Sequence, residues 1–121
     1  MGESHPVIPN VFHLTLVHNP GIAFGLFRQH PVILTGLISL SLVVLFIWSA
    51  RMSRLNTGAR ICFALILGGA AGNWIDRIRF GRVIDFLDFR VWPVFNIADS
   101  AITIGVALLF LIFFRQPEQF K

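Results

Sequence analysis

The stretch PVILTGLISLSLVVLFIWSA, residues 31–50, contains no charged side chain. As an α-helix it would be roughly 30 Å long, which matches the hydrocarbon core of a bilayer. It therefore predicts a transmembrane helix. Two further apolar runs follow, and we predict transmembrane helices over residues 61–76 and 97–114. The uncharged part of the second run is short for a span, so its helix is expected to continue past Asp76 and Arg77 into the membrane interface.

The composition indicates an integral membrane protein. Of the 121 residues, 55% are hydrophobic and only 13% are charged, and the mean hydropathy is +0.75. The charged share is about half of that in soluble domains, which excludes a disordered chain and an ordinary soluble enzyme. The net charge of +4 does not indicate a nucleic-acid partner, because the arginines stand at the ends of the apolar runs, where membrane proteins place their anchors. We predict a single membrane domain over residues 1–121.

The N-terminal segment is predicted to be extended. Four prolines between positions 6 and 31 forbid one continuous helix. Phe12, Leu14 and Leu16 alternate with residues 13, 15 and 17 in the period of a strand, and N-P-G at 19–21 is typical of a turn. We therefore expect residues 7–30 to form a small β-like platform at the membrane surface. The predicted fold class is an all-α integral membrane protein with three transmembrane helices and this β-like segment.

Acidic residues cluster between the second and third predicted spans. Four of the six fall there, namely Asp76, Asp85, Asp88 and Asp99. An ionisable side chain at membrane depth is costly, so each is a functional candidate. Asp99 is the clearest case, since apolar and small residues surround it. The structural alternative is that Asp99 or Ser100 caps the helix that follows.

Asp85 and Asp99 are the pair most able to act together. Pro93 separates them, so they are not neighbours on one helix, but antiparallel spans would bring their positions together. Two carboxylates in contact in a low dielectric share a proton. One can then act as a general base for water while the other polarises a carbonyl. A small transporter or proton-relay subunit would use the same two aspartates.

The other charged residues of this region have structural interpretations. Asp76 and Arg77 are expected to form an ion pair at the membrane interface. Asp88 and Arg90 are expected to form a solvated surface pair.

The small residues GGAAG at 68–72 indicate close packing of two helices. Asn73 is expected to form a hydrogen bond across that contact. No metal site is expected, because Cys62 is the one cysteine and His13 and His18 have no carboxylate or thiol nearby in the sequence.

Three blocks carry a more specific signature: HNPGIAFGLF (18–27), GGAAGNWIDRIRFGRVIDF (68–86) and VFNIADSAITIGV (94–106). In order and spacing they resemble the lipoprotein signal peptidases, the signal peptidase II family of bacterial inner-membrane aspartic proteases. The combination of G-N-x-x-D-R, G-x-V-x-D-F and F-N-x-A-D-S is highly specific, because it is not a generic membrane pattern.

The resemblance implies an aspartic endopeptidase that removes the signal peptide from a diacylglyceryl-modified prolipoprotein, cleaving before the lipidated cysteine, without metal or cofactor. It implies Asp85 and Asp99 as the catalytic pair, with the acid and base roles left open. The partners it implies are the prolipoprotein substrate and membrane lipid. The expected substrate-binding and supporting residues are Asn19, Gly21, Ala23, Phe24, Gly72, Asn73, Asp76, Arg77, Asn96 and Ala98.

The resemblance also implies a multi-pass protein of the bacterial inner (cytoplasmic) membrane, with residues 1–30 and 77–90 outside. The family has four transmembrane helices, of which the first carries an Asp-x-x-Ser/Thr-Lys motif. No such helix precedes Pro31, so we expect this chain to be one span short of the family. The alternative function is that of a non-catalytic membrane relative that binds lipid or signal peptide.

Overall fold

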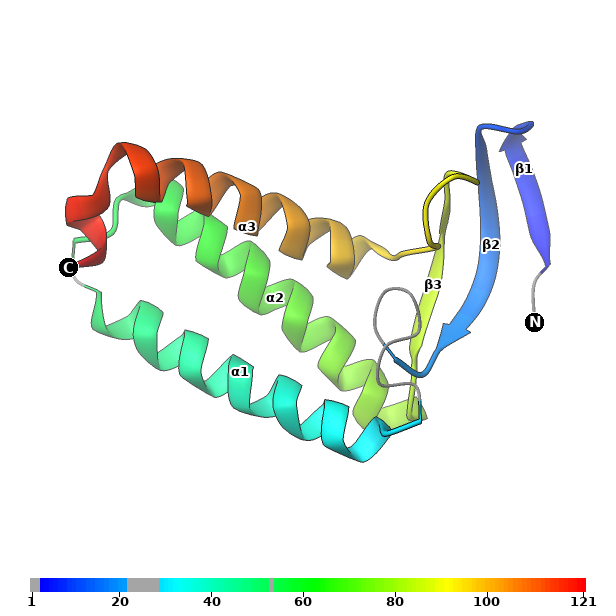
Figure 1. The fold of residues 1–121 in the computed structure, drawn as a ribbon, viewed down its shortest axis with the longest axis horizontal. Coiled ribbons are helices and arrows are strands. Elements are labelled where there is room, and N and C mark those ends of the chain that lie inside the picture. The colour runs from blue at the N-terminus through cyan, green and yellow to red at the C-terminus, as the bar shows by residue number, and fades with distance from the viewer. Residues whose placement is uncertain (1–2, 22–28, 53) are drawn as a thin grey trace.

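A computed structural model describes residues 3–21, 29–52 and 54–121. The elements follow in the order β1 (Ser4–Ile8), β2 (Phe12–Asn19), α1 (Pro31–Arg51), α2 (Thr57–Phe80), β3 (Val83–Asp88), α3 (Ile97–Arg115) and the short 3-10 helix η2 (Pro117–Phe120). The three long helices run side by side, with the strands at one end and the C-terminus at the other (Figure 1). All three helices are long and apolar enough to cross a membrane.

The second helix is longer than the predicted range of 61–76. It begins at Thr57 because Asn56 caps it, the Asn56 side chain accepting a hydrogen bond from Ala59 N at 2.9 Å. It continues past Asp76, as its short apolar core requires, and ends where Gly81 adopts a left-handed conformation with φ of 71°. The extra turns carry the charged residues of both ends toward the aqueous interfaces.

Helices α2 and α3 pack closely through glycines, as the GGAAG stretch predicts. A Cβ atom at Gly69 would lie 2.5 Å from the backbone oxygen of Ala98, so only glycine fits there. On α3, a Cβ atom at Gly105 would lie 2.9 Å from the backbone oxygen of Cys62. Gly68 faces open space. The contact therefore uses Gly69, with Gly72 against Ala98, rather than the whole small-residue stretch.

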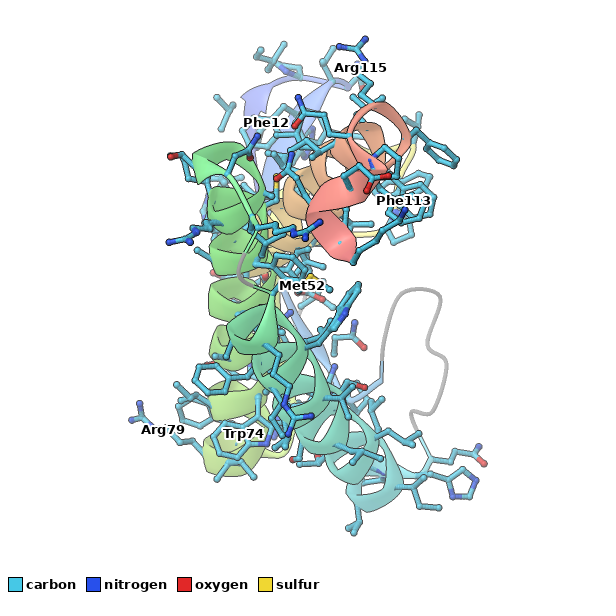
Figure 2. The ribbon with its side chains drawn as sticks, turned by 90° about the vertical axis from the view of Figure 1, so that its left-hand side faces the viewer. Phe12, Met52, Trp74, Arg79, Phe113 and Arg115 are labelled. Atoms are coloured by element: carbon cyan, nitrogen blue, oxygen red, sulfur yellow. The ribbon has the colours of Figure 1, made fainter. Side chains whose placement is uncertain are left out.

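The end of the bundle that carries the C-terminus is closed by a hydrophobic cluster. Met52, Leu55, Ala59 and Phe63 are buried there, and Phe120 of η2 packs against them. Figure 2 looks along the bundle from this end and shows Met52 pointing between the helices, with Phe113 and Arg115 pointing away. The C-terminal residues thus fold back onto the connection between α1 and α2.

The description all-α is inexact, because the chain also forms a three-stranded antiparallel sheet in the order β1-β2-β3. The second strand lies within the expected platform of residues 7–30, whereas β1 begins before it, at Ser4, and residues 22–28 of that segment lie outside the described residues. The third strand, β3, was not predicted: its six residues are too few to show a clear period. In the register of the sheet, Val17 pairs with Asp85 and Asn19 with Val83, so β3 brings Asp85 to the end of β2.

Candidate active site

Asp85 is held by side-chain amides from two other elements. It is 2% exposed, and its position in the middle of β3 fixes its backbone in the sheet. Asn19, at the end of β2, donates from Nδ2 to Asp85 Oδ2 at 3.2 Å. Asn96 donates from Nδ2 to Asp85 Oδ1 at 3.0 Å. Both carboxyl oxygens therefore have donors in a site that water reaches poorly.

Asp99 lies in the first turn of α3, but the residue that caps this helix is Asn96. The Asn96 side chain accepts from Asp99 N at 2.8 Å, and Asp99 Oδ2 accepts from Asn96 N at 3.1 Å. This reciprocal capping box corrects the prediction that Asp99 or Ser100 is the cap. Asn73 of α2 donates from Nδ2 to Asp99 Oδ1 at 2.8 Å, which confirms the expected bond across the helix contact.

A chain of amides connects the two carboxylates. Asn96 Nδ2 donates both to Asp85 Oδ1 and to Asn73 Oδ1, each at 3.0 Å. Asn73 in turn donates to Asp99. The side chain of Asn96 thus contacts Asp85, Asn73 and the backbone of Asp99 at once, so the relative position of the two aspartates depends on it.

Arg77 does not pair with Asp76. It is 8% exposed in the last turns of α2, and its guanidinium donates to Gly21 O at 2.5 Å and to Pro20 O at 3.4 Å. Asp76 forms no salt bridge with any residue in the ranges that the structure describes. The predicted ion pair is therefore wrong, because adjacent residues on a helix point in different directions and Arg77 faces inward.

The contacts of Arg77 fix the turn that follows β2. Gly21 N donates to Asn19 Oδ1 at 3.0 Å, which closes the expected turn at 19–21. Arg77 holds the carbonyls of the same turn, and this leaves Asn19 Nδ2 aimed at Asp85. The positive charge of Arg77 also acts on both Asp85 and Asp99.

Burial dominates the electrostatics of Asp85. Loss of solvent raises its pKa to about 6, and the negative charge of Asp99 adds to the rise. The hydrogen bonds from Asn19 and Asn96 and the charge of Arg77 oppose it. A carboxyl group with this pKa is about half protonated at pH 6 and about one-tenth protonated at pH 7, far more than an ordinary aspartate, so it can donate a proton.

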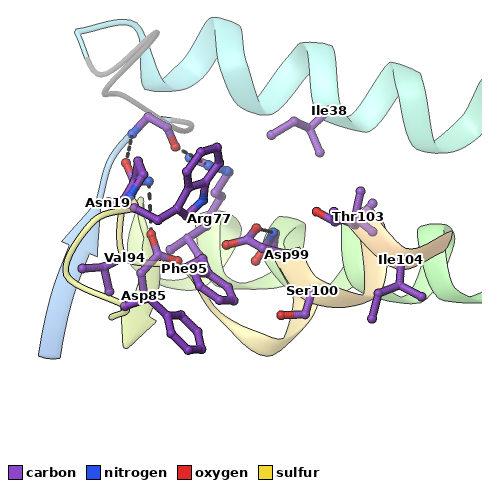
Figure 3. A pocket seen from close by; sticks show the side chains of 18 residues that line it. Asn19, Ile38, Arg77, Asp85, Val94, Phe95, Asp99, Ser100, Thr103 and Ile104 are labelled. Carbon is purple, nitrogen blue, oxygen red and sulfur yellow. Dashed lines mark hydrogen bonds between the residues drawn. The ribbon is translucent and has the colours of Figure 1, made fainter. Parts of the chain in front are cut away.

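Both aspartates line one cavity of about 820 Å³ (Figure 3). Asn19, Gly21, Asn73 and Arg77 line it as well. Its remaining walls are mostly apolar and come from the three long helices, β3 and the connection between β3 and α3, namely Ile38, Ala70, Val83, Phe89, Trp92, Pro93, Val94, Phe95, Ser100, Ile102, Thr103 and Ile104. The site is therefore a polar cluster facing an apolar cavity.

Asp88 lies outside this cavity, and its expected pair with Arg90 is present but not solvated. Arg90 Nη1 lies 3.1 Å from Asp88 Oδ2, while Asp88 itself is 5% exposed. Thr15 of β2 donates to the same carboxylate at 2.7 Å. The hydrogen bond from Thr15 is the main reason why the pKa of Asp88 is lowered. Asp88 is buried because β2 pairs with β3 at this position.

The other expected site residues have different positions. Asn96 reaches both aspartates directly, whereas Gly72 and Ala98 contribute by letting α2 and α3 approach. Ala23 and Phe24 lie outside the described residues. Sequence reasoning missed Ile38 and Thr103 as cavity residues. The helical period could have indicated Thr103, because it lies four positions after Asp99 on the same helix face.

Comparison with known proteins identifies the family. The family model described as "Signal peptidase (SPase) II" matches residues 1–115. A lipoprotein signal peptidase of Halothermothrix orenii is 48% identical over 120 residues, covering 98% of this chain and 81% of its own length. Another, from Moorella thermoacetica, is 50% identical over 107 residues, covering 88% of this chain and 71% of its own.

Solved structures agree with this assignment. A bacterial membrane enzyme determined by the in meso method at 2.3 Å resolution superimposes with a TM-score of 0.89 at 31% identity, over 100% of this chain and 76% of that one. A second, at 1.9 Å resolution, gives 0.84 at 32% identity, over 96% of this chain and 77% of that one. Three helices of the described residues are long and apolar enough to span a membrane, and the chain is a multi-pass membrane protein that belongs to the signal peptidase II family of aspartic proteases.

Proposed function

We propose that Asp85 and Asp99 are the catalytic pair with which this chain removes the signal peptide from a diacylglyceryl-modified prolipoprotein, cleaving before the lipidated cysteine. The observation that carries the proposal is that both carboxylates line the same apolar cavity and are linked through Asn96 and Asn73. A membrane-anchored substrate needs an apolar site, and peptide hydrolysis needs an acid and a base within it.

Asp85 is the acid in this proposal and Asp99 the base. Asp85 has the raised pKa, so it is the carboxyl of the pair that holds the proton. Asp99 removes a proton from water, whose oxygen attacks the scissile carbonyl carbon while Asp85 gives its proton to the carbonyl oxygen. In the collapse of the tetrahedral diol, Asp99 returns its proton to the leaving nitrogen as the C–N bond breaks. Asp85 takes a proton back from a hydroxyl group, which restores the starting state.

The proposed location is the bacterial cytoplasmic membrane, with the sheet and the carboxylate pair at the outer surface. The sheet lies at one end of the helices, and the connection between α1 and α2 and the C-terminus lie at the other (Figure 1). This separation suits a substrate whose signal peptide runs through the bilayer and whose lipidated cysteine lies near the outer surface.

The test is cleavage of a lipidated precursor by the purified chain in detergent. Asp85→Asn and Asp99→Asn should each lower kcat by at least about 100-fold, since general acid and base catalysis contribute about 10²–10⁴-fold. Asp88→Asn is the matched control, because Asp88 is also a buried aspartate of β3 but does not line the cavity. Near-normal turnover in either of the first two variants would overturn the proposed pair. A wild-type chain that binds the precursor but never cleaves it would indicate a non-catalytic relative.

A further inference from the structure

Resting on the proposed function, we infer that the Thr103 hydroxyl donates a hydrogen bond to a backbone carbonyl of the signal peptide, about two residues before the scissile bond. Thr103 is then a specificity-determining residue, which recognises an unwound peptide at membrane depth rather than any particular side chain.

The first observation is the position of Thr103. It lines the cavity on α3, four residues after Asp99, and therefore one turn further along the same face. Figure 3 shows Asp99 and Thr103 on the side of α3 that faces Ile38, while Ser100 and Ile104 point the other way. The rise of an α-helix places Thr103 about 6 Å beyond Asp99, toward the middle of the bilayer.

The second observation is that the Thr103 hydroxyl makes no hydrogen bond with the residues that the structure describes. Two hydroxyl side chains line the cavity within the described residues, and Ser100 uses its own to donate to Asn96 O at 3.2 Å. Thr35 on α1 shows the usual behaviour of threonine in a membrane helix, donating to Pro31 O at 2.8 Å. Thr103 makes no such bond to the helix or to any other described residue, and its side chain is exposed toward the cavity.

The chemistry of the substrate supplies the partner. Two carboxylates can reach a scissile bond only where the peptide helix around that bond is unwound. The amide groups beside the bond then lose their helical hydrogen bonds. In an apolar cavity each unsatisfied amide group is costly, and a protein group must replace the lost partner. An extended peptide advances about 3.3 Å per residue. A peptide bond held at Asp99 thus places a carbonyl two residues upstream beside Thr103.

The matched variants are Thr103→Val, which keeps the shape and removes the hydroxyl, and Thr103→Ser, which keeps the hydroxyl. With a lipidated precursor in detergent, Thr103→Val should raise KM about fivefold, the effect of losing one neutral hydrogen bond, with kcat within twofold. Thr103→Ser should stay within twofold of wild type in both. Thr35→Val is the control, since it removes a hydroxyl that is already bonded within its own helix. An unchanged KM in Thr103→Val would overturn the inference, as would a KM in Thr103→Ser that rises as much as in Thr103→Val.

A substrate variant tests the identity of the partner. Replacing the backbone amide bond two residues before the scissile bond by an ester weakens the carbonyl as an acceptor. This change should raise KM for wild type but not for Thr103→Val. A second precursor carries ether-linked lipid in place of the diacylglyceryl ester on its cysteine. If wild type and Thr103→Val have the same KM for this precursor, Thr103 binds the diacylglyceryl ester and the peptide assignment is wrong. These outcomes are separate from the test of the proposed catalytic pair, which fails if Asp85→Asn or Asp99→Asn remains active.

Discussion

Removal of the Asn96 side chain amide should inactivate the enzyme without unfolding it. Asn96 has two separable roles: its Oδ1 caps α3 through Asp99 N, and its Nδ2 donates to Asp85 Oδ1. Serine at this position retains the cap but is too short to reach Asp85, whereas alanine loses both functions. Asn96 Nδ2 makes two hydrogen bonds to side chains in the site, to Asp85 and to Asn73. A neutral hydrogen bond contributes about 0.5–1.5 kcal/mol, so losing both should lower kcat about 5- to 100-fold in both Asn96→Ser and Asn96→Ala.

Stability should separate the same two variants. Losing the cap costs about 1 kcal/mol, so Asn96→Ala should be less stable than Asn96→Ser by that amount. Asn56→Ala is the control, because the Asn56 side chain likewise accepts from a backbone N–H in the first turn of α2, at the end of the bundle away from the site. It should lower the stability with no change of kcat. The assays are precursor cleavage and the thermal midpoint in detergent. An Asn96→Ser variant with activity within twofold of wild type would refute the reasoning, as would an Asn56→Ala variant that loses as much activity.

Two further predictions concern titration and packing. The raised pKa of Asp85 means that the folded chain binds this proton more tightly than the unfolded chain, so stability should fall as the pH rises from about 4 to 6, by at most about 3 kcal/mol. Asp85→Asn should remove this slope from thermal midpoints measured across that range, and an unchanged slope would show that Asp85 is not its source. Gly69→Ala should lower the thermal midpoint and the activity together, because the new Cβ would meet the Ala98 backbone at 2.5 Å, whereas Gly68→Ala meets nothing and should resemble wild type. Equal behaviour of the two glycine variants would refute the close contact of α2 with α3.

The helices could be predicted from the sequence because each depends on a local property. The apolar length of residues 31–50 and the polar residues around the other runs identify α1, α2 and α3. The strand β3 could not be predicted in this way. It is short, and it is stabilised by pairing with β2, a partner more than sixty positions away in the chain.

Of the candidate site, too, only part could be predicted from the sequence. Asp85 and Asp99 stand out because a carboxylate in an apolar sequence is costly wherever the chain places it. The network that joins them depends on side-chain direction. Asn96 reaches Asp85 only because β3 lies beside the start of α3, and Arg77 turns to the carbonyls at 20 and 21 rather than to its neighbour Asp76. Asp88 is buried for the same tertiary reason.

The pH dependence of kcat tests the central claim, that Asp85 and Asp99 work as one pair with a single proton between them. The claim predicts a bell-shaped profile, because one carboxyl must be ionised and the other protonated. The alkaline limb should lie at or above about 6, since a bound substrate removes more water from Asp85 and raises its pKa further. A profile measured from about pH 4 to 9 that is flat, or that has a single limb, would contradict the account.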